Sequence, residues 1–218
     1  MICRKRESHT MSEETYAWSV RETHPPHVDV IALVSFGANE YGLTNGTKQV
    51  VKLGLEAQKK YPNARVVFGE FTGNNIFDYE HQIKMKFFPD ALYADRVIST
   101  IKEALAWRHA VRNMIFLQNI LIITDEMHSR SARRVSNRVF NGVWFTRLFK
   151  KLTGKHLIRI HVKTFATEDN IDLDNPMTNL RDKQKWFNAN VSRELFLTLC
   201  PFGYTIMRVL NIHQPTSK

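Results

Sequence analysis

Residues Gln118–Arg134 have the sequence Gln-Asn-Ile-Leu-Ile-Ile-Thr-Asp-Glu-Met-His-Ser-Arg-Ser-Ala-Arg-Arg, in which a short apolar run stops at a polar, basic cluster. The run Ile120–Ile123 does not alternate apolar and polar residues, which is typical of a parallel strand buried on both faces. Open α/β sheets bind ligands beyond the carboxyl ends of their strands. The polar residues that follow the run are therefore candidate site residues: Thr124, Asp125, Glu126, His128 and Arg130. A polar loop is also expected after any buried strand, so this segment alone leaves both interpretations open.

Three other segments have the composition of strands, namely Val28–Ser35, Ala64–Phe68 and Leu157–Phe165. Helical spacing of apolar residues predicts helices between the four strands, at about 47–60, 77–88, 100–116, 131–140 and 143–152. Alternating strands and helices are typical of an α/β fold with a mainly parallel sheet and crossover helices. We expect a flexible leader over residues 1–24 and a single α/β domain over 25–218, with a helical C-terminal extension from about residue 178.

The composition narrows the class of protein. With 218 residues and 43% hydrophobic residues, the chain can bury one substantial core. Cys3 and Cys200 lie at opposite ends and match neither a disulfide framework nor a zinc site. No signal peptide and no membrane-spanning run is visible, so we expect a cytoplasmic protein.

The net charge of +10 is concentrated in one region. No acid lies between Glu126 and Glu168, whereas ten bases do, and the remainder of the chain is neutral. Such a field favours an anionic partner, whether a phosphorylated metabolite, a nucleotide, nucleic acid or an acidic membrane surface. A solvated basic face that raises solubility is the alternative. No recognition helix or RNA-stacking motif accompanies the basic region 130–163, and we expect its aromatic residues Trp144, Phe145 and Phe149 to form one buried stripe.

Four short motifs at or near the expected strand ends together resemble the YdcF-like family, which contains SanA and ElyC. They are Val-Ser-Phe-Gly at 34–37, Val-Phe-Gly-Glu at 67–70, the glutamate-bearing Ser99–Ala104, and the segment after the third strand. In the family that last segment has the form His-x-x-Arg-Ala. Here His128 and Ala132 keep their places, while Ser131 stands where the family has arginine, which leaves Arg130 or Arg133 to supply the charge.

The resemblance implies a Rossmann-like three-layer sandwich with a pocket at the carboxyl ends of the strands. It also implies a nucleotide-type ligand and an association with bacterial envelope maintenance. On this basis His128 and Glu103 are the candidate catalytic residues, and Glu103 is expected to orient His128 or to hold a ligand hydroxyl. The candidate ligand-binding residues are Gly37, Asn39, Gly69, Thr124, Asp125, Arg130 and Arg133.

Each candidate also has a structural alternative. The alternative for His128 is a loop histidine that caps the following helix, and the alternative for Glu103 is a helix-surface acid paired with a neighbouring base. Asp125 and Glu126 are adjacent and point in different directions, so we expect no metal site. The dinucleotide fingerprint Gly-x-Gly-x-x-Gly is absent, which argues against an ordinary nicotinamide dehydrogenase, and the sequence identifies no cofactor.

The leading hypothesis is therefore a protein that binds a small anionic ligand, nucleotide-like or phosphorylated, and transfers or hydrolyses a group on it. Two alternatives remain from the sequence. One is a nucleic-acid-binding module that uses Arg133, Arg134, Arg138, Lys150 and Lys151. The other is a non-catalytic interaction protein.

Overall fold

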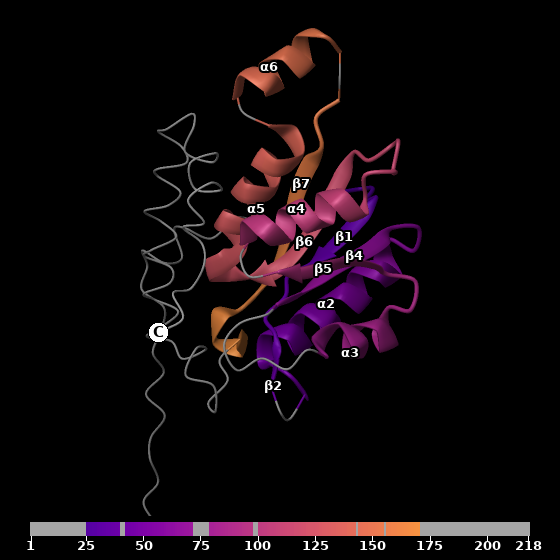
Figure 1. Ribbon diagram of the computed structural model, residues 1–218, viewed down its shortest axis with the longest axis vertical. Coiled ribbons are helices and arrows are strands. Elements are labelled where there is room, and N and C mark those ends of the chain that lie inside the picture. The colour runs from indigo at the N-terminus through magenta and orange to yellow at the C-terminus, as the bar shows by residue number, and fades with distance from the viewer. Residues whose placement is uncertain are drawn as a thin grey trace, which may run out of the picture.

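A sheet of five parallel strands forms the middle layer of the computed structural model (Figure 1). The structure describes residues 25–39, 42–71, 79–97, 100–142, 144–154 and 156–170. The strand order is β5-β4-β1-β6-β7. The bounds are Val30–Leu33 for β1, Arg65–Phe71 for β4, Leu92–Val97 for β5, Asn119–Asp125 for β6 and Arg159–Phe165 for β7.

Helices cover both faces of the sheet. One core contains residues of α2 (Asn45–Lys60) and α3 (Glu80–Phe87), packed on Ile31, Leu33 and Ile123. The other contains residues of α4 (Thr100–Ala110) and α5 (Glu126–Asn141), packed on Val30, Ala32 and Ile122. The described fold is thus a Rossmann-like three-layer sandwich with a parallel sheet, as predicted.

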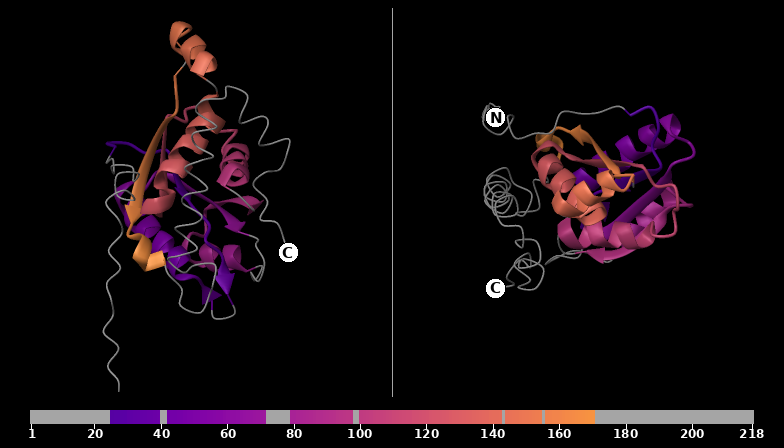
Figure 2. Two further views of the ribbon diagram at one scale, coloured as in Figure 1. Left: turned by 90° about the vertical axis from the view of Figure 1, so that its left-hand side faces the viewer. Right: turned by 90° about the horizontal axis from the view of Figure 1, so that it is seen from above.

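Three smaller elements and one further helix complete the described fold. A two-stranded antiparallel pair, β2 (Ala38–Asn39) and β3 (Gly42–Leu43), leads from β1 to α2. The 3₁₀ helix η1 (Thr167–Asn170) follows β7. Helix α6 (Trp144–Leu152) stands away from the body of the molecule, beyond the edge of the sheet where the strands begin (Figure 2).

The apolar composition of β1 and β6 follows from their central positions. All four residues of β1 and all seven of β6 are buried. Each strand has sheet neighbours on both sides and helices on both faces, so a polar residue would have no water to contact. β7 alternates exposed or half-buried residues with buried ones, as predicted for an edge strand.

Three sequence predictions were wrong in their boundaries or number. The edge strand β5 was missed, because only Ala94 and Val97 of its six residues are buried. The helix predicted to reach residue 116 ends at Ala110, and the helix predicted to begin at Ser131 begins at Glu126. Predictions for residues 1–24 and for the tail beyond 170 lie outside the described residues. None of the helices in the described ranges is long and apolar enough to cross a bilayer.

Candidate functional site

The order in which strands are added to the sheet reverses at β1, and this reversal locates the candidate site. From β1 the chain moves to β4 and β5 on one side, then returns to β6 and β7 on the other. The helix after β1, α2, covers one face of the sheet, and the helix after β6, α5, covers the other. Ligands of open α/β sheets bind where the two connections diverge. We call this place the switch point and define it as residues 34–37 and 124–128.

His128 lies at the switch point and joins three elements. It occupies the first turn of α5 and is 4% exposed. Its Nε2 lies 3.3 Å from Oγ1 of Thr100, the first residue of α4. Its ring packs edge-on against Phe36 after β1, with centroids 6.4 Å apart. The switch point therefore brings together the beginnings of α4 and α5.

The helix cap at this position is Asp125, which corrects the structural alternative for His128. The Asp125 side chain accepts a hydrogen bond of 2.7 Å from the backbone N–H of His128. The histidine is thus a helical residue, and not a loop residue that caps the helix. Asp125 itself is buried and used as the cap, which explains an acid at the start of α5 without a ligand.

Glu103 is expected to orient His128, but no described contact joins the two side chains. Its Oε1 accepts a 2.8 Å hydrogen bond from the backbone N–H of Ser35, and Thr100, one turn earlier on α4, is the residue that contacts the His128 ring. Burial raises the pKa of Glu103 to about 8, against the opposing effect of the Ser35 N–H. Glu103 is therefore a buried acid that keeps its proton at neutral pH.

A buried ion pair next to this carboxyl was not predicted. Lys84 Nζ and Glu80 Oε1 of α3 are 2.7 Å apart, and neither side chain has exposed surface. Lys84 also donates to Ser35 Oγ at 3.1 Å. Glu80 accepts from the backbone N–H of Phe71 at 2.9 Å, and its Oε1 lies 3.2 Å from Thr47 Oγ1. The pair thus ties α3 to β1, α2 and β4.

The two glycines proposed as ligand contacts have structural roles. Gly69 lies inside β4, where a Cβ atom would come within 3.0 Å of the Asp95 carbonyl oxygen of β5. Gly37 has a φ of 89°, and its carbonyl accepts hydrogen bonds from the hydroxyls of Thr44 and Thr47 at the start of α2. Both positions require glycine or favour it for backbone reasons. Asn39 ends β2, but its side chain lies outside the described residues.

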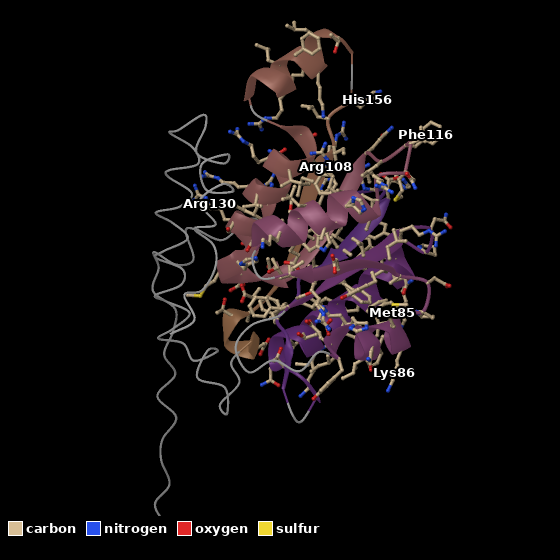
Figure 3. All side chains as sticks on the ribbon, in the orientation of Figure 1. Met85, Lys86, Arg108, Phe116, Arg130 and His156 are labelled. Carbon is tan, nitrogen blue, oxygen red and sulfur yellow. The ribbon has the colours of Figure 1, made fainter. Side chains whose placement is uncertain are left out.

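Neither candidate arginine is placed at the switch point by a described contact. Arg130 projects from the outer side of α5 (Figure 3). Arg133 is exposed and lies close enough to His161 of β7 that, after burial, its charge is the main cause of the lowered pKa of His161. His161 lies in the first half of β7 and the switch point is at the other end of the sheet, so this neighbour of Arg133 is not at the switch point.

Thr124 is the one predicted ligand residue whose side chain has an unused polar group. Among the described residues its Oγ1 has no hydrogen-bond partner, and the side chain is fully buried. Side chains alternate along β6, so Thr124 lies on the same face as Ile122, under α4 and α5. Burying a hydroxyl without a partner costs about 1–3 kcal/mol, which a bound polar group would recover.

Two hollows on the described surface lie away from the switch point. One, of about 480 Å³, runs beside α2 and includes Val51, Leu55 and Phe87. Another, of about 320 Å³, includes Leu148 and Leu157 beside α6. At the switch point Phe36 packs on both His128 and Phe165. A ligand that reaches Thr124 must therefore displace covering side chains. The described residues contain no group of three or more His, Cys, Asp or Glu arranged to hold a metal ion.

Comparison with known proteins gives no family for the chain. No protein-family model and no curated protein matches it.

Proposed function

We propose that this protein is a YdcF-like α/β protein that binds a small nucleotide-like or phosphorylated anion at the switch point. The observation that carries the proposal is the contact between Thr100 and His128 at the point where the strand order reverses. It brings the N-termini of α4 and α5 together, and the N-terminal N–H groups and dipole of a helix attract anions. The resemblance to the YdcF-like family, whose fold is of this type, adds support.

Three buried glutamates near the switch point do not oppose an anionic ligand. Glu80 is neutralised by Lys84, and Glu103 keeps its proton at neutral pH because its pKa is raised to about 8. Glu70, at the end of β4, has cationic and hydroxyl partners: Arg96 Nε lies 3.6 Å and Tyr93 OH 3.3 Å from its Oε2. These three glutamates therefore add little net negative charge, and the fourth buried acid, Asp125, accepts the backbone N–H of His128.

The chemistry of the site favours phosphoryl oxygens over a carbocyclic or aliphatic ligand. His128 and the hydroxyls of Thr100 and Thr124 can each donate a hydrogen bond to an anionic oxygen. The arginines of α5 are not required for this recognition. Because Asp125 already caps α5, the proposal relies on the start of α4 and on the ring of His128. The family arginine, replaced here by Ser131, is in this proposal not restored by Arg133.

A thermal-shift screen tests the binding proposal. Nucleoside mono-, di- and triphosphates and sugar phosphates are added to the wild type, to His128→Ala and to the matched control His156→Ala, an exposed histidine at the opposite end of the molecule (Figure 3). A ligand at 100 times its Kd stabilises the fold by about 2.7 kcal/mol, or several degrees in Tm. We expect this shift in the wild type and in His156→Ala and its loss in His128→Ala. No shift with any compound, or an undiminished shift in His128→Ala, contradicts the proposal.

The protonated carboxyl of Glu103 favours a second function at the same site, transfer or hydrolysis of a phosphoryl or glycosyl group on the bound ligand. A carboxylic acid with a pKa near 8 can donate a proton to a leaving group at neutral pH. Glu103→Gln preserves the acceptor for the Ser35 N–H but cannot release a proton. We expect this variant to keep the thermal shift and to lose turnover of the ligand by at least about a hundredfold. Equal turnover in both proteins excludes Glu103 as the acid.

A further inference from the structure

Helix α6 exposes an apolar surface that no sequence prediction anticipated. Phe149 was expected in a buried stripe, yet it is 61% exposed, and its neighbours Leu148 and Leu152 are 49% and 77% exposed. The helix stands away from the body of the molecule in two perpendicular views (Figures 1 and 2). Exposed side chains of this size on one short helix are unusual in a surface that contacts only water.

The apolar and basic residues of α6 lie on different sides of the helix. Leu148 and Leu152 are four residues apart and share a face, which Phe149 extends. Arg147 and Lys151 are also four residues apart, and Lys150 lies beside them, on the side that the apolar residues leave free. A basic face beside an apolar face is the pattern of helices that lie in the plane of a membrane interface.

We propose that α6 is a docking element for an anionic lipid surface. In this arrangement Leu148, Phe149 and Leu152 enter the boundary between headgroups and acyl chains, and Arg147, Lys150 and Lys151 contact the negatively charged headgroups. The helix adjoins the start of β7, at the end of the sheet opposite the switch point. The proposal is therefore independent of the strand-end ligand, whose site lies at the other end of the sheet from the docked helix.

Charge complementarity favours a membrane over the other occupants of this surface. The chain has ten basic residues and no acid between Glu126 and Glu168, so a second copy would bring two strongly positive surfaces together. Nucleic acid would satisfy the cations of α6, but it would leave the exposed side chains of Leu148 and Leu152 in water. An anionic bilayer is the surface that offers negative charge and an apolar interior side by side.

Co-sedimentation of the full-length protein with vesicles tests the proposal. Vesicles of phosphatidylcholine alone are compared with vesicles that also contain phosphatidylglycerol. We expect binding to the anionic vesicles only. Phe149→Ser with Leu152→Ser should weaken this binding by at least about tenfold, because two apolar anchors are lost. Lys150→Glu with Lys151→Glu should weaken it by more than about tenfold, since one basic residue near such a surface contributes about a fivefold factor.

Matched controls separate α6 from exposed residues elsewhere. Ile115→Ser with Phe116→Ser removes two apolar side chains that are even more exposed, at the loop before β6, and Lys59→Glu with Lys60→Glu reverses two lysines at the end of α2. Both controls should bind anionic vesicles like the wild type, as should His128→Ala.

A failure of the wild type to bind overturns the proposal. The proposal is also overturned if Lys150→Glu with Lys151→Glu loses binding while Phe149→Ser with Leu152→Ser keeps it. That result indicates a general polyanion site. Dissociation of a wild-type dimer by the Phe149 and Leu152 changes, without vesicle binding, identifies a second copy as the occupant.

Discussion

The Lys84 ammonium lies 2.7 Å from the Glu80 carboxylate, with both side chains withdrawn from solvent and one turn apart on α3. Lys84 also lies 5.3 Å from the centre of the Phe68 ring and donates to Ser35 Oγ. Each ion is thus compensated within the protein, and removing either one leaves the other charged in a site without water. Helix α3 is short and has little apolar surface of its own, and this ion pair holds it in place on the sheet.

Lys84→Met should destabilise the protein by about 3–5 kcal/mol, because the Glu80 carboxylate is then buried without its cation. The measurement is urea-induced unfolding at neutral pH. Lys86→Met, on the exposed side of the same helix, should change the unfolding free energy by less than about 0.5 kcal/mol. Adding Glu80→Gln to Lys84→Met should recover part of the loss. Equal stability of Lys84→Met and Lys86→Met would show that the buried pair contributes nothing to the free energy of unfolding.

Glu103 should make the stability of the wild type fall as the pH rises from about 4.5 to about 8. Burial raises the pKa of this carboxyl to about 8 in the folded protein, whereas the unfolded chain releases the proton near 4.5. Between these values the unfolded state binds fewer protons than the folded state, so the slope is negative, at most about 1.4 kcal/mol for each pH unit. Above about pH 8 the contribution is constant.

Glu103→Gln removes this proton, so the variant should have a flatter stability profile over that pH range. The check is a series of urea unfolding curves for both proteins at pH values across it. Lys102→Gln, one residue earlier on α4 and exposed, serves as the control and should keep the wild-type slope. Parallel profiles for wild type and Glu103→Gln would mean that the carboxyl ionises normally in the folded state.

The central strands could be predicted from sequence, and the buried ion pair could not. Ile120–Ile123 is a continuous apolar run because β6 is covered on all sides, so its burial can be predicted from the local composition. Glu80 and Lys84 have the spacing of an ordinary surface pair on a helix. Only the packing of α3 against β1 and β4, which depends on residues far apart in sequence, places them in the interior.

The same distinction applies to the candidate site. Asp125 and His128 follow the predicted strand, so their position at the switch point could be inferred from topology. The partner of His128 could not, because Thr100 lies 28 residues earlier and contacts it only through the packing of α4 against α5. Phe149 shows the reverse error, since its apolar character predicts burial in a core that α6 does not reach.

Gly54→Ala should destabilise the protein by at least about 1 kcal/mol, although alanine is the better helix former by about that amount. A Cβ at this position would lie 2.9 Å from Phe88 Cζ and 3.0 Å from Leu33 Cδ2, so α2 would have to move away from β1. Thermal and urea unfolding measure the loss. Lys52→Ala, exposed on the same helix, should be neutral or slightly stabilising. A stabilised Gly54→Ala variant would show that the Phe88 ring adjusts without cost.

Asp29→Asn should cost about 2 kcal/mol, because this side chain joins the start of β1 to the start of β6. The Asp29 Oδ2 accepts hydrogen bonds from the backbone N–H groups of Asn119 at 2.7 Å and Gln118 at 2.9 Å. An asparagine amide either turns its NH₂ group toward these N–H groups, or presents its oxygen without the negative charge that strengthens both bonds. Burial favours the protonated carboxyl, but these N–H groups, with His27, outweigh it and lower the pKa of Asp29 below 3.8. The stabilisation is therefore present above that value and is lost as the pH falls through the lowered pKa of the folded state.

The control is Asp90→Asn, which changes an exposed acid in the turn after α3. In urea unfolding at neutral pH this variant should match the wild type. If Asp29→Asn also matches it, the two backbone N–H groups are satisfied without a carboxylate, and the junction of β1 with β6 rests on the strand ladder alone.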